Sequence, residues 1–279
     1  MIMNNNELYS LIKKQELVTA PGIFDGLSAR LAEQAGFSAV YASGGAIARS
    51  TGVPDIGLLT LTEVSDRLRQ ITGATNLPVI ADADTGFGNE INVKRTVELF
   101  KNAGVAALHL EDQQFPKRCG HLGGKSLISI EEMIQKIAVA KKHAGNMMII
   151  ARTDAIAVTG FEDAIDRAKQ YVEVGADMIF VEAPETLVQI ELIAKQVPGP
   201  KLINMFHSGK TPLVSTEHLK EMGYQLIIIP SDLQRAAMAG MKSVLAEIYK
   251  TGNSGALSSQ MLSFSEREQV VKTTEFLKP

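Results

Sequence analysis

The chain has 279 residues, of which 45% are hydrophobic and 21% are charged, and its net charge is -3 at pH 7. This composition is that of a soluble globular protein, and it gives no reason to expect nucleic acid or a membrane surface as a partner. The single cysteine excludes an internal disulfide. The first residues lack the apolar stretch of a signal peptide, and no apolar run reaches the ~20 residues that span a bilayer, so we expect a cytoplasmic protein.

Short apolar runs alternate with amphipathic helical patterns along the whole chain. Between the runs the hydrophobic period becomes helical, as at Leu61, Val64, Leu68 and Ile71. Runs that are apolar throughout are typical of parallel strands buried on both faces. The expected strands are residues 17–23, 39–44, 78–84, 107–112, 147–154, 178–183, 201–206 and 225–230. Eight such units predict an α/β fold, a (β/α)8 TIM barrel forming one domain over residues 1–279, with a helical extension from about residue 255.

A repeated spacing supports one βα unit in register around the barrel. Four expected helices end in a glycine just before a strand, where a left-handed backbone conformation favours glycine. In each case the position seven residues later is a strand end. The glycines are Gly36, Gly104, Gly175 and Gly223, and the strand ends are Ser43, Glu111, Glu182 and Pro230. No linker interrupts the pattern, so a second domain is not expected.

Polar side chains gather where the expected strands end, which is the face on which barrel enzymes keep their chemistry. Asp82 and Asp84 lie two residues apart on one expected strand, so their side chains should share a face, and Glu111 ends the next strand. Three adjacent carboxylates repel one another unless a cation lies between them. Without clustered His or Cys, this set favours Mg²⁺, with Mn²⁺ as the alternative, over zinc. Alternatively, Asp84 only begins a tight turn with residues 85–88.

Two further strand ends could bind a substrate anion. Ser43, Gly44 and Gly45 present backbone N–H groups without side-chain obstruction, although an ordinary tight turn explains them nearly as well. Arg152 could form a bidentate pair with a carboxylate. Its alternative is a structural ion pair with Glu182 or Asp154.

The segment 115–125 is longer than a usual βα loop, and long barrel loops often close over a substrate. Within it, Cys119 is flanked by Lys117, Arg118 and His121. Such a positive environment favours the thiolate, and this thiol could exchange a proton with a carbon acid. The alternative is an incidental exposed cysteine. His109, inside its strand, is expected to be a core residue.

The chain resembles the isocitrate lyase and phosphoenolpyruvate mutase superfamily over essentially its whole length. The motifs that carry the resemblance lie at residues 43–45, 52–55, 82–88, 111–113, 117–121, 151–154 and 182–183. The Lys-Arg-Cys-Gly-His loop at 117–121 is the most specific of them. It is similar to that of the lyases, methylisocitrate lyases above all, whereas phosphonate mutases usually lack the cysteine. The loop at 204–212 looks closer to lyases of 2-alkylmalates and to oxaloacetate-cleaving relatives.

The resemblance implies a role for each matching residue. Asp82 would hold Mg²⁺, supported through water by Asp84 and Glu111, and Cys119 would be the general acid and base. The other implied catalytic residues are Arg152, Lys117, His121 and Glu111. The implied substrate-binding residues are Ser43, Gly44, Gly45, Asp55, Gly120, Glu182, Asn204 and Thr211. The resemblance also implies a homotetramer in which C-terminal helices are exchanged between subunits.

The function expected from these residues is Mg²⁺-dependent carbon–carbon cleavage. The substrate would be 2-methylisocitrate or a similar 2-substituted malate, and the products pyruvate or another oxo acid and a dicarboxylate, through an enolate-type intermediate. An oxaloacetate decarboxylase or hydrolase is the alternative, and it has less need of Cys119. A phosphonopyruvate or phosphoenolpyruvate mutase is disfavoured by the 117–121 loop, and a non-enzymatic barrel is disfavoured by the complete set of polar residues.

Overall fold

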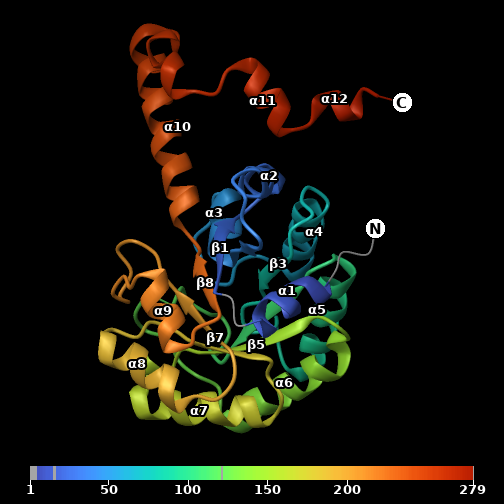
Figure 1. Ribbon diagram of the computed structural model, residues 1–279, viewed down its shortest axis with the longest axis vertical. Helices are drawn as coiled ribbons and strands as arrows, with labels where there is room; N and C mark the ends of the chain where they lie inside the picture. The colour runs from blue at the N-terminus through green and yellow to red at the C-terminus, as the bar shows by residue number, and fades with distance from the viewer. Residues whose placement is uncertain (1–4, 15–16, 121, 279) are drawn as a thin grey trace.

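The computed structural model describes residues 5–14, 17–120 and 122–278. Eight parallel strands form a closed barrel in which each strand pairs with the next and β8 pairs with β1 (Figure 1). The strands are β1 Val18–Ile23, β2 Val40–Ala42, β3 Val79–Asp82, β4 Ala107–Glu111, β5 Met148–Thr153, β6 Met178–Val181, β7 Lys201–Asn204 and β8 Leu226–Ile229. The predicted fold class is therefore confirmed. Each observed strand lies within its expected run, and the main differences are at the strand ends.

Helices surround the barrel and extend beyond it. They are α1 Asn5–Lys13, α2 Gly26–Gln34, α3 Gly44–Ser50, α4 Leu61–Thr72, α5 Glu90–Asn102, α6 Ile130–Ala144, α7 Phe161–Glu173, α8 Leu187–Gln196, α9 Thr216–Met222, α10 Asp232–Thr251, α11 Phe264–Val270 and α12 Thr273–Phe276. The apolar face predicted for α4 is confirmed, because Val64, Leu68 and Ile71 are buried. Short 3₁₀ helices cover Ala155–Ala157 and Gly255–Gln260.

The core has two apolar layers, because side chains alternate between the inside and the outside of the barrel. On β3, Ile80 belongs to the inner layer, whereas its neighbours Val79 and Ala81 belong to the layer under the helices. Leu8 and Ile12 of α1 join the inner layer together with Val18 at the start of β1. Helix α1 therefore closes the end of the barrel where the strands begin, and the opposite end carries the polar strand ends.

The four glycines of the repeated spacing have the backbone conformation that the sequence predicts. Gly36, Gly104, Gly175 and Gly223 have φ angles of 86°, 84°, 106° and 89°. Residues with a Cβ adopt this left-handed region only at a steric cost. Each glycine thus lets the chain leave a helix and enter the next strand.

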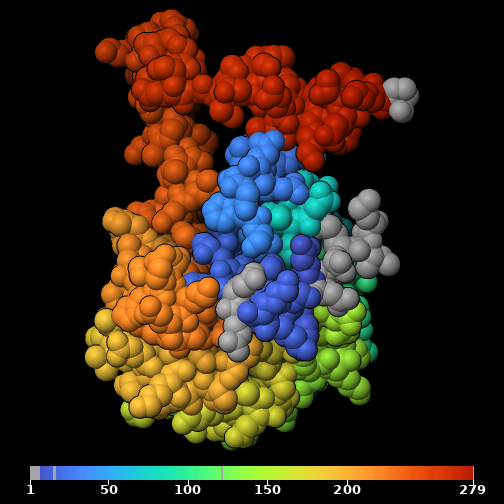
Figure 2. All heavy atoms as spheres, in the orientation of Figure 1, coloured from blue at the N-terminus to red at the C-terminus, as the bar shows by residue number. Residues whose placement is uncertain are grey.

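Helix α10 projects away from the barrel, and the chain then turns back so that α11 contacts α2 (Figures 1 and 2). Only the first turns of α10 lie beside the mouth of the barrel. Its outer part carries large exposed side chains, such as Leu245 (65% exposed) and Tyr249 (96% exposed). None of the described helices combines the length and the apolar character that crossing a membrane requires.

Candidate active site

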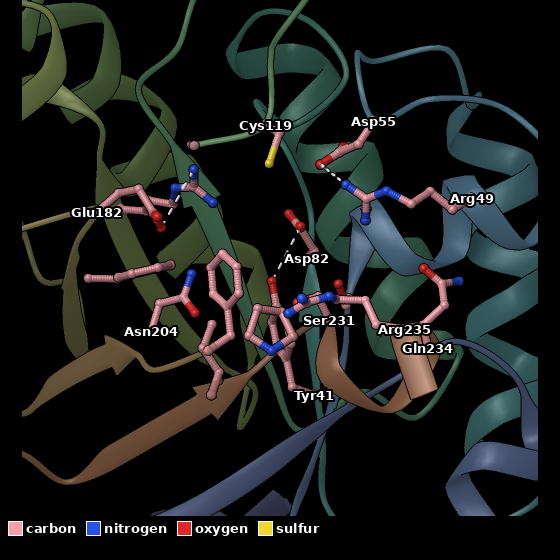
Figure 3. A pocket seen from close by; sticks show the side chains of 18 of the residues that line it. Tyr41, Arg49, Asp55, Asp82, Cys119, Glu182, Asn204, Ser231, Gln234 and Arg235 are labelled. Carbon is pink, nitrogen blue, oxygen red and sulfur yellow. Dashed lines mark hydrogen bonds and ion pairs between the residues drawn. The ribbon is translucent and has the colours of Figure 1, made fainter. Parts of the chain in front are cut away.

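A cavity of about 360 Å³ opens where the strands end (Figure 3). Ten of the predicted site residues line it: Ser43, Gly45, Asp55, Asp82, Lys117, Cys119, Gly120, Arg152, Glu182 and Asn204. Gly44, Asp84 and Glu111 lie directly behind this wall, where they contact lining residues. Thr211 is buried but does not line the cavity. His121 lies outside the described residues.

Asp82 is the last residue of β3, and its carboxylate faces the cavity. It accepts hydrogen bonds from the backbone N–H of Gly44 (3.2 Å) and the hydroxyl of Tyr41 (3.3 Å), and its other oxygen lies 3.3 Å from Nε2 of His109. Burial raises the pKa of Asp82, but its interactions with His109, Lys117 and Arg152 outweigh this effect and lower the pKa below its ordinary value. Asp82 is therefore a fixed, ionised carboxylate.

Position 44 requires a glycine because the carboxylate of Asp82 lies too close to leave room for a side chain. A Cβ atom at position 44 would lie 2.6 Å from Oδ2 of Asp82, and one at position 45 would lie 2.6 Å from Oδ2 of Asp55. Ser43 caps helix α3 by accepting a hydrogen bond from the N–H of Ala46. The segment 43–45 is therefore the start of a short helix packed against two carboxylates. It is not an isolated tight turn.

The structure corrects the reason for grouping Asp84 with Asp82. Strand β3 ends at Asp82, so the two side chains do not share a face of one strand. Asp84 has a φ of 47° and lies in the turn that follows, as the alternative interpretation expected. Its carboxylate nevertheless lies 2.7 Å from Nζ of Lys117, which also pairs with Asp55. Burial raises the pKa of Asp84 to about 6.

Glu111 ends β4 behind the cavity wall, and its side chain is 1% exposed. One oxygen lies 3.3 Å from Arg152, and the other, Oε1, has no hydrogen-bond partner in the described part of the chain. Burial raises the pKa of Glu111 well above its ordinary value, against the opposing charge of Arg152. An unpartnered buried carboxylate oxygen is costly unless a further donor or cation reaches it.

These carboxylates suit a hard divalent cation in their chemistry. Asp82, Asp84 and Glu111 supply only oxygen atoms, as Mg²⁺ prefers, and Mg²⁺ usually keeps several water ligands. Within the described ranges, no three His, Cys, Asp or Glu side chains form a complete ligand set. The oxygen donors and the unpartnered Oε1 of Glu111 nevertheless fit such a cation, which Asp82 would hold, with Asp84 and Glu111 supporting it through water.

Arg152 forms the structural ion pairs that its alternative interpretation expected. Its Nε donates to Asp154 (2.8 Å), and its Nη2 lies 3.7 Å from Glu182, so it is part of a buried ion-pair network. It also lines the cavity and lies over the ring of Phe180 at 5.2 Å. Arg152 is thus a cation held in place from behind, with one face directed to the cavity.

The loop after β4 places Cys119 and Gly120 on the cavity wall, and Figure 3 shows the Cys119 sulfur directed toward the interior. A Cβ atom on Gly120 would lie 2.6 Å from Nη2 of Arg152, so only glycine allows this approach. The positive charges expected around the thiol have other partners. Lys117 pairs with Asp55 and Asp84, and Arg118 donates to the Gly123 carbonyl at 3.0 Å.

Several residues of the site were not predicted. Tyr41 and His109 meet inside the barrel at 2.6 Å, beside Asp82. Tyr41 lies two positions before the predicted site residue Ser43, and His109 lies two positions before Glu111. A polar side chain within an otherwise apolar strand was the sequence signal that could have identified them. His109 is fully buried as expected, but it faces the site. The opposite wall comes from α3 and the start of α10 and includes Arg49, Gln234 and Arg235 (Figure 3).

The fold and the cavity define an α/β-barrel protein with an acidic polar site at the carboxyl ends of its strands. The chain belongs to the phosphoenolpyruvate phosphomutase family, whose model matches residues 8–249. It is 45% identical over 259 residues to a 2-methylisocitrate lyase of Aeropyrum pernix, covering 93% of this chain and 84% of that protein.

Two solved structures are similar over nearly the whole length. A 2,3-dimethylmalate lyase superposes with a TM-score of 0.94 at 35% identity, covering 100% of this chain and 94% of the other. An oxaloacetate acetylhydrolase in complex with 3,3-difluorooxalacetate also superposes with a TM-score of 0.94, at 32% identity, covering 99% and 96% of the two chains.

Proposed function

We propose that this protein is a Mg²⁺-dependent carbon–carbon lyase. It would cleave 2-methylisocitrate or a similar 2-substituted malate into pyruvate, or another oxo acid, and a dicarboxylate. The observation that carries this proposal is that the thiol of Cys119 lines the same cavity as Asp82 and Arg152. The cavity would therefore hold three groups that the reaction needs. The thiol can protonate a carbon atom, the carboxylate can bind a cation, and the guanidinium can donate hydrogen bonds to an oxyanion. The similarity to a 2-methylisocitrate lyase and a 2,3-dimethylmalate lyase supports the same reaction class.

Asp82 would hold the cation, and Asp84 and Glu111 would support it through water. Mn²⁺ is the alternative ion for the same oxygen ligands. When bound, such an ion stabilises negative charge that develops on substrate oxygens. Lys117 would act indirectly by keeping the carboxylates of Asp55 and Asp84 in place.

The protein's own groups would then bind the substrate and transfer a proton. The N–H of Gly44 donates to Asp82 and that of Ser43 to the Ile23 carbonyl. The hydroxyl of Ser43 and the N–H of Gly45 would therefore bind the carboxylate of the pyruvate unit, and Arg152 would donate to the oxygen that becomes the ketone. The substrate hydroxyl would lose its proton to a carboxylate at the strand ends, and its oxygen would become the ketone as the carbon–carbon bond breaks. The electron pair of that bond would stay on the α-carbon of the departing dicarboxylate. Cys119 would donate a proton to that carbon. Gly120, Glu182 and Asn204 would complete the substrate-binding wall, and the roles of His121 and Thr211 stay predictions.

A panel assay of oxo-acid release tests this function. The panel contains 2-methylisocitrate, isocitrate, 2,3-dimethylmalate, oxaloacetate and phosphonopyruvate, each with Mg²⁺ and with excess chelator. We expect release from a 2-substituted malate that requires the cation. Activity on phosphonopyruvate alone, or equal activity in chelator, would contradict the proposal.

Hydrolysis of oxaloacetate is the second function that an observation favours. The match to oxaloacetate acetylhydrolase is as close, by TM-score, as the match to 2,3-dimethylmalate lyase. The same cation and oxyanion site would stabilise the enolate in both reactions. Measuring oxalate and acetate in the oxaloacetate arm of the panel separates this activity from cleavage of a 2-substituted malate.

We further propose that the protein is a cytoplasmic homotetramer with small carboxylic acids as its substrates. The projection of α10 away from its own barrel supports an assembly in which C-terminal helices of one subunit pack on another. The exposed apolar side chains of this helix would then be buried.

A further inference from the structure

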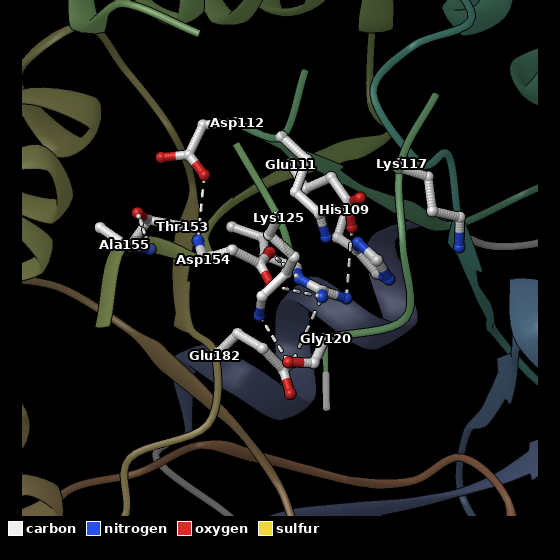
Figure 4. Close-up of polar contacts among 12 residues, drawn as sticks. His109, Glu111, Asp112, Lys117, Gly120, Lys125, Thr153, Asp154, Ala155 and Glu182 are labelled. Carbon is white, nitrogen blue, oxygen red and sulfur yellow. Dashed lines mark hydrogen bonds and ion pairs between the residues drawn. The ribbon is translucent and has the colours of Figure 1, made fainter. Parts of the chain in front are cut away.

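Lys125 lies at the end of the loop that carries Cys119, and its side chain is only 2% exposed. Its amino group lies 2.8 Å from Oδ1 of Asp154 and also donates to the carbonyl oxygen of Gly120 (Figure 4). A buried ammonium group needs partners that replace its lost hydration. Both partners of Lys125 adjoin the cavity, because Gly120 follows Cys119 and Asp154 holds Arg152.

Asp154, the carboxylate partner of Lys125, is itself held in place by several hydrogen bonds. Its carboxylate accepts from Nε of Arg152 at 2.8 Å and from Nη2 at 3.1 Å, and it is fully buried. Its backbone N–H donates to the carboxylate of Asp112 at 2.9 Å, which holds the end of β5 in place. The same carboxylate therefore positions the site arginine and, through Lys125, one end of the loop.

The loop is also held on the other side of Cys119. The side-chain amide of Gln113 donates to the carbonyl of Arg118 at 2.8 Å and accepts from its N–H at 2.9 Å. The residue before Cys119 is thus fixed by Gln113, and the residue after it by Lys125. Neither contact involves the thiol itself.

We propose that Lys125 is a positioning residue that ties the Gly120 carbonyl to Asp154 and thereby directs the Cys119 thiol toward the cavity beside Arg152. The inference rests on the proposed role of Cys119 as the proton donor. Without the amino group, the carbonyl of Gly120 loses its charged donor. The segment 118–120 is then held only through the backbone of Arg118. The thiol, which belongs to a half-buried residue in the wild type, then spends more time away from the cavity and becomes more accessible to solvent.

The single cysteine of the chain makes this inference measurable, because alkylation by iodoacetamide reports Cys119 alone. In Lys125→Met, we expect the alkylation rate of the ligand-free protein to rise at least about tenfold, since the net contribution of one hydrogen bond from a charged donor corresponds to about this factor. We expect kcat to fall at least about tenfold, with KM changed less than about threefold, because the loss affects alignment of the proton donor more than substrate binding. Lys125→Arg retains the charge and should largely restore both values.

Lys141→Met is the control for losing a lysine–carboxylate ion pair elsewhere, because the half-buried Lys141 pairs with Asp177 at 2.6 Å where β6 begins, far from the loop. It should leave alkylation and kcat at wild-type values. Thermal unfolding of every variant is measured first, and Lys125→Gln provides a second neutral variant. If both neutral variants lose cooperative unfolding, Lys125 is only a structural residue and the inference is wrong.

A wild-type alkylation rate in folded Lys125→Met would also overturn the inference, even if the protein proves to be a lyase. Conversely, a protein inactive on the whole substrate panel would refute the proposed function, while the alkylation rates would still decide how Cys119 is positioned. The two failures are therefore distinguishable.

Discussion

At the scale of single residues, Cys119 is the group whose chemistry can be tested most directly. A serine at this position has similar size, but its hydroxyl is a much weaker acid than a thiol. We expect Cys119→Ser to lower kcat for oxo-acid release by a factor of about 100 to 10,000, the range that a positioned acid contributes. The variant should bind Mg²⁺ with wild-type affinity, because no sulfur ligand is proposed. A kcat within a few-fold of wild type would show that another group protonates the carbanion.

The raised pKa of Asp84 predicts how cation binding depends on pH. Burial places this pKa at about 6, so Asp84 is protonated and neutral below that pH and charged above it. Protons and cations compete for such a site, so affinity should rise with pH. We expect the Mg²⁺ dissociation constant to fall about tenfold from about pH 5 to about pH 7, measured by titration calorimetry.

Asp84→Asn is the control for this dependence, because its amide carries no charge at any pH. It should bind Mg²⁺ more weakly and show a smaller pH dependence over the same interval. A wild-type affinity that is constant across this range would contradict a supporting role for Asp84. An unchanged pH dependence in Asp84→Asn would assign the proton to another group, with Glu111 the next to test because its pKa is also raised.

At the scale of secondary-structure elements, the contact between α3 and the end of β3 constrains position 44. A Cβ atom there would lie 2.6 Å from Asp82, which is closer than non-bonded atoms approach. We expect Gly44→Ala to displace the carboxylate or the helix and to lower kcat/KM by at least about 100-fold, as misplacement of about 1 Å in an active site can.

Gly240→Ala is the matched substitution for Gly44→Ala. Gly240 lies within α10, and a Cβ atom there meets nothing within 4 Å. Alanine is favoured over glycine in a helix by about 1 kcal/mol, so stability should rise slightly while kcat/KM stays unchanged. Equal activity of the two variants would show that the Gly44–Asp82 contact is unimportant for catalysis.

The elements of the barrel could be predicted from the sequence because their signals are local. A fully apolar run identifies a strand buried on both faces, and a left-handed glycine such as Gly104 marks the boundary that precedes it. Because such a strand is buried on both faces, its sequence does not show which side chains line the inside of the barrel. Tyr41 and His109 are as buried as residues under the helices, so only the closed barrel shows that they face Asp82.

The rest of the site depends on contacts between residues that are distant in sequence. Lys117 was expected to promote the reactivity of its neighbour Cys119, but its long side chain reaches Asp55 and Asp84 instead. The turn after β3 places Asp84 by a backbone conformation that strand alternation does not predict. The wall formed by α10 had no sequence signal, because Gln234 and Arg235 also suit an exposed helix.

At the scale of the whole molecule, helix α10 carries an unusual apolar stripe. Met238, Met241, Leu245 and Ile248 are spaced three, four and three residues apart and therefore lie along one side of the helix. They are 48%, 57%, 65% and 43% exposed. A projecting helix with such a stripe is stabilised when another subunit covers it. This stripe supports a contact between subunits, as in the homotetramer that we propose.

Replacing one residue of the stripe should break that assembly. We expect the wild type to have a mass of about four times 30.1 kDa by light scattering after size exclusion. Leu245→Asp places a charge in the contact, and burying an unpaired carboxylate costs several kcal/mol, so this variant should dissociate into smaller species. Val188→Asp changes a side chain of similar exposure (61%) on α8 of the barrel, and it should keep the wild-type mass. A monomeric wild type, or a Leu245→Asp variant of unchanged mass, would mean that the apolar stripe of α10 is not the contact between subunits.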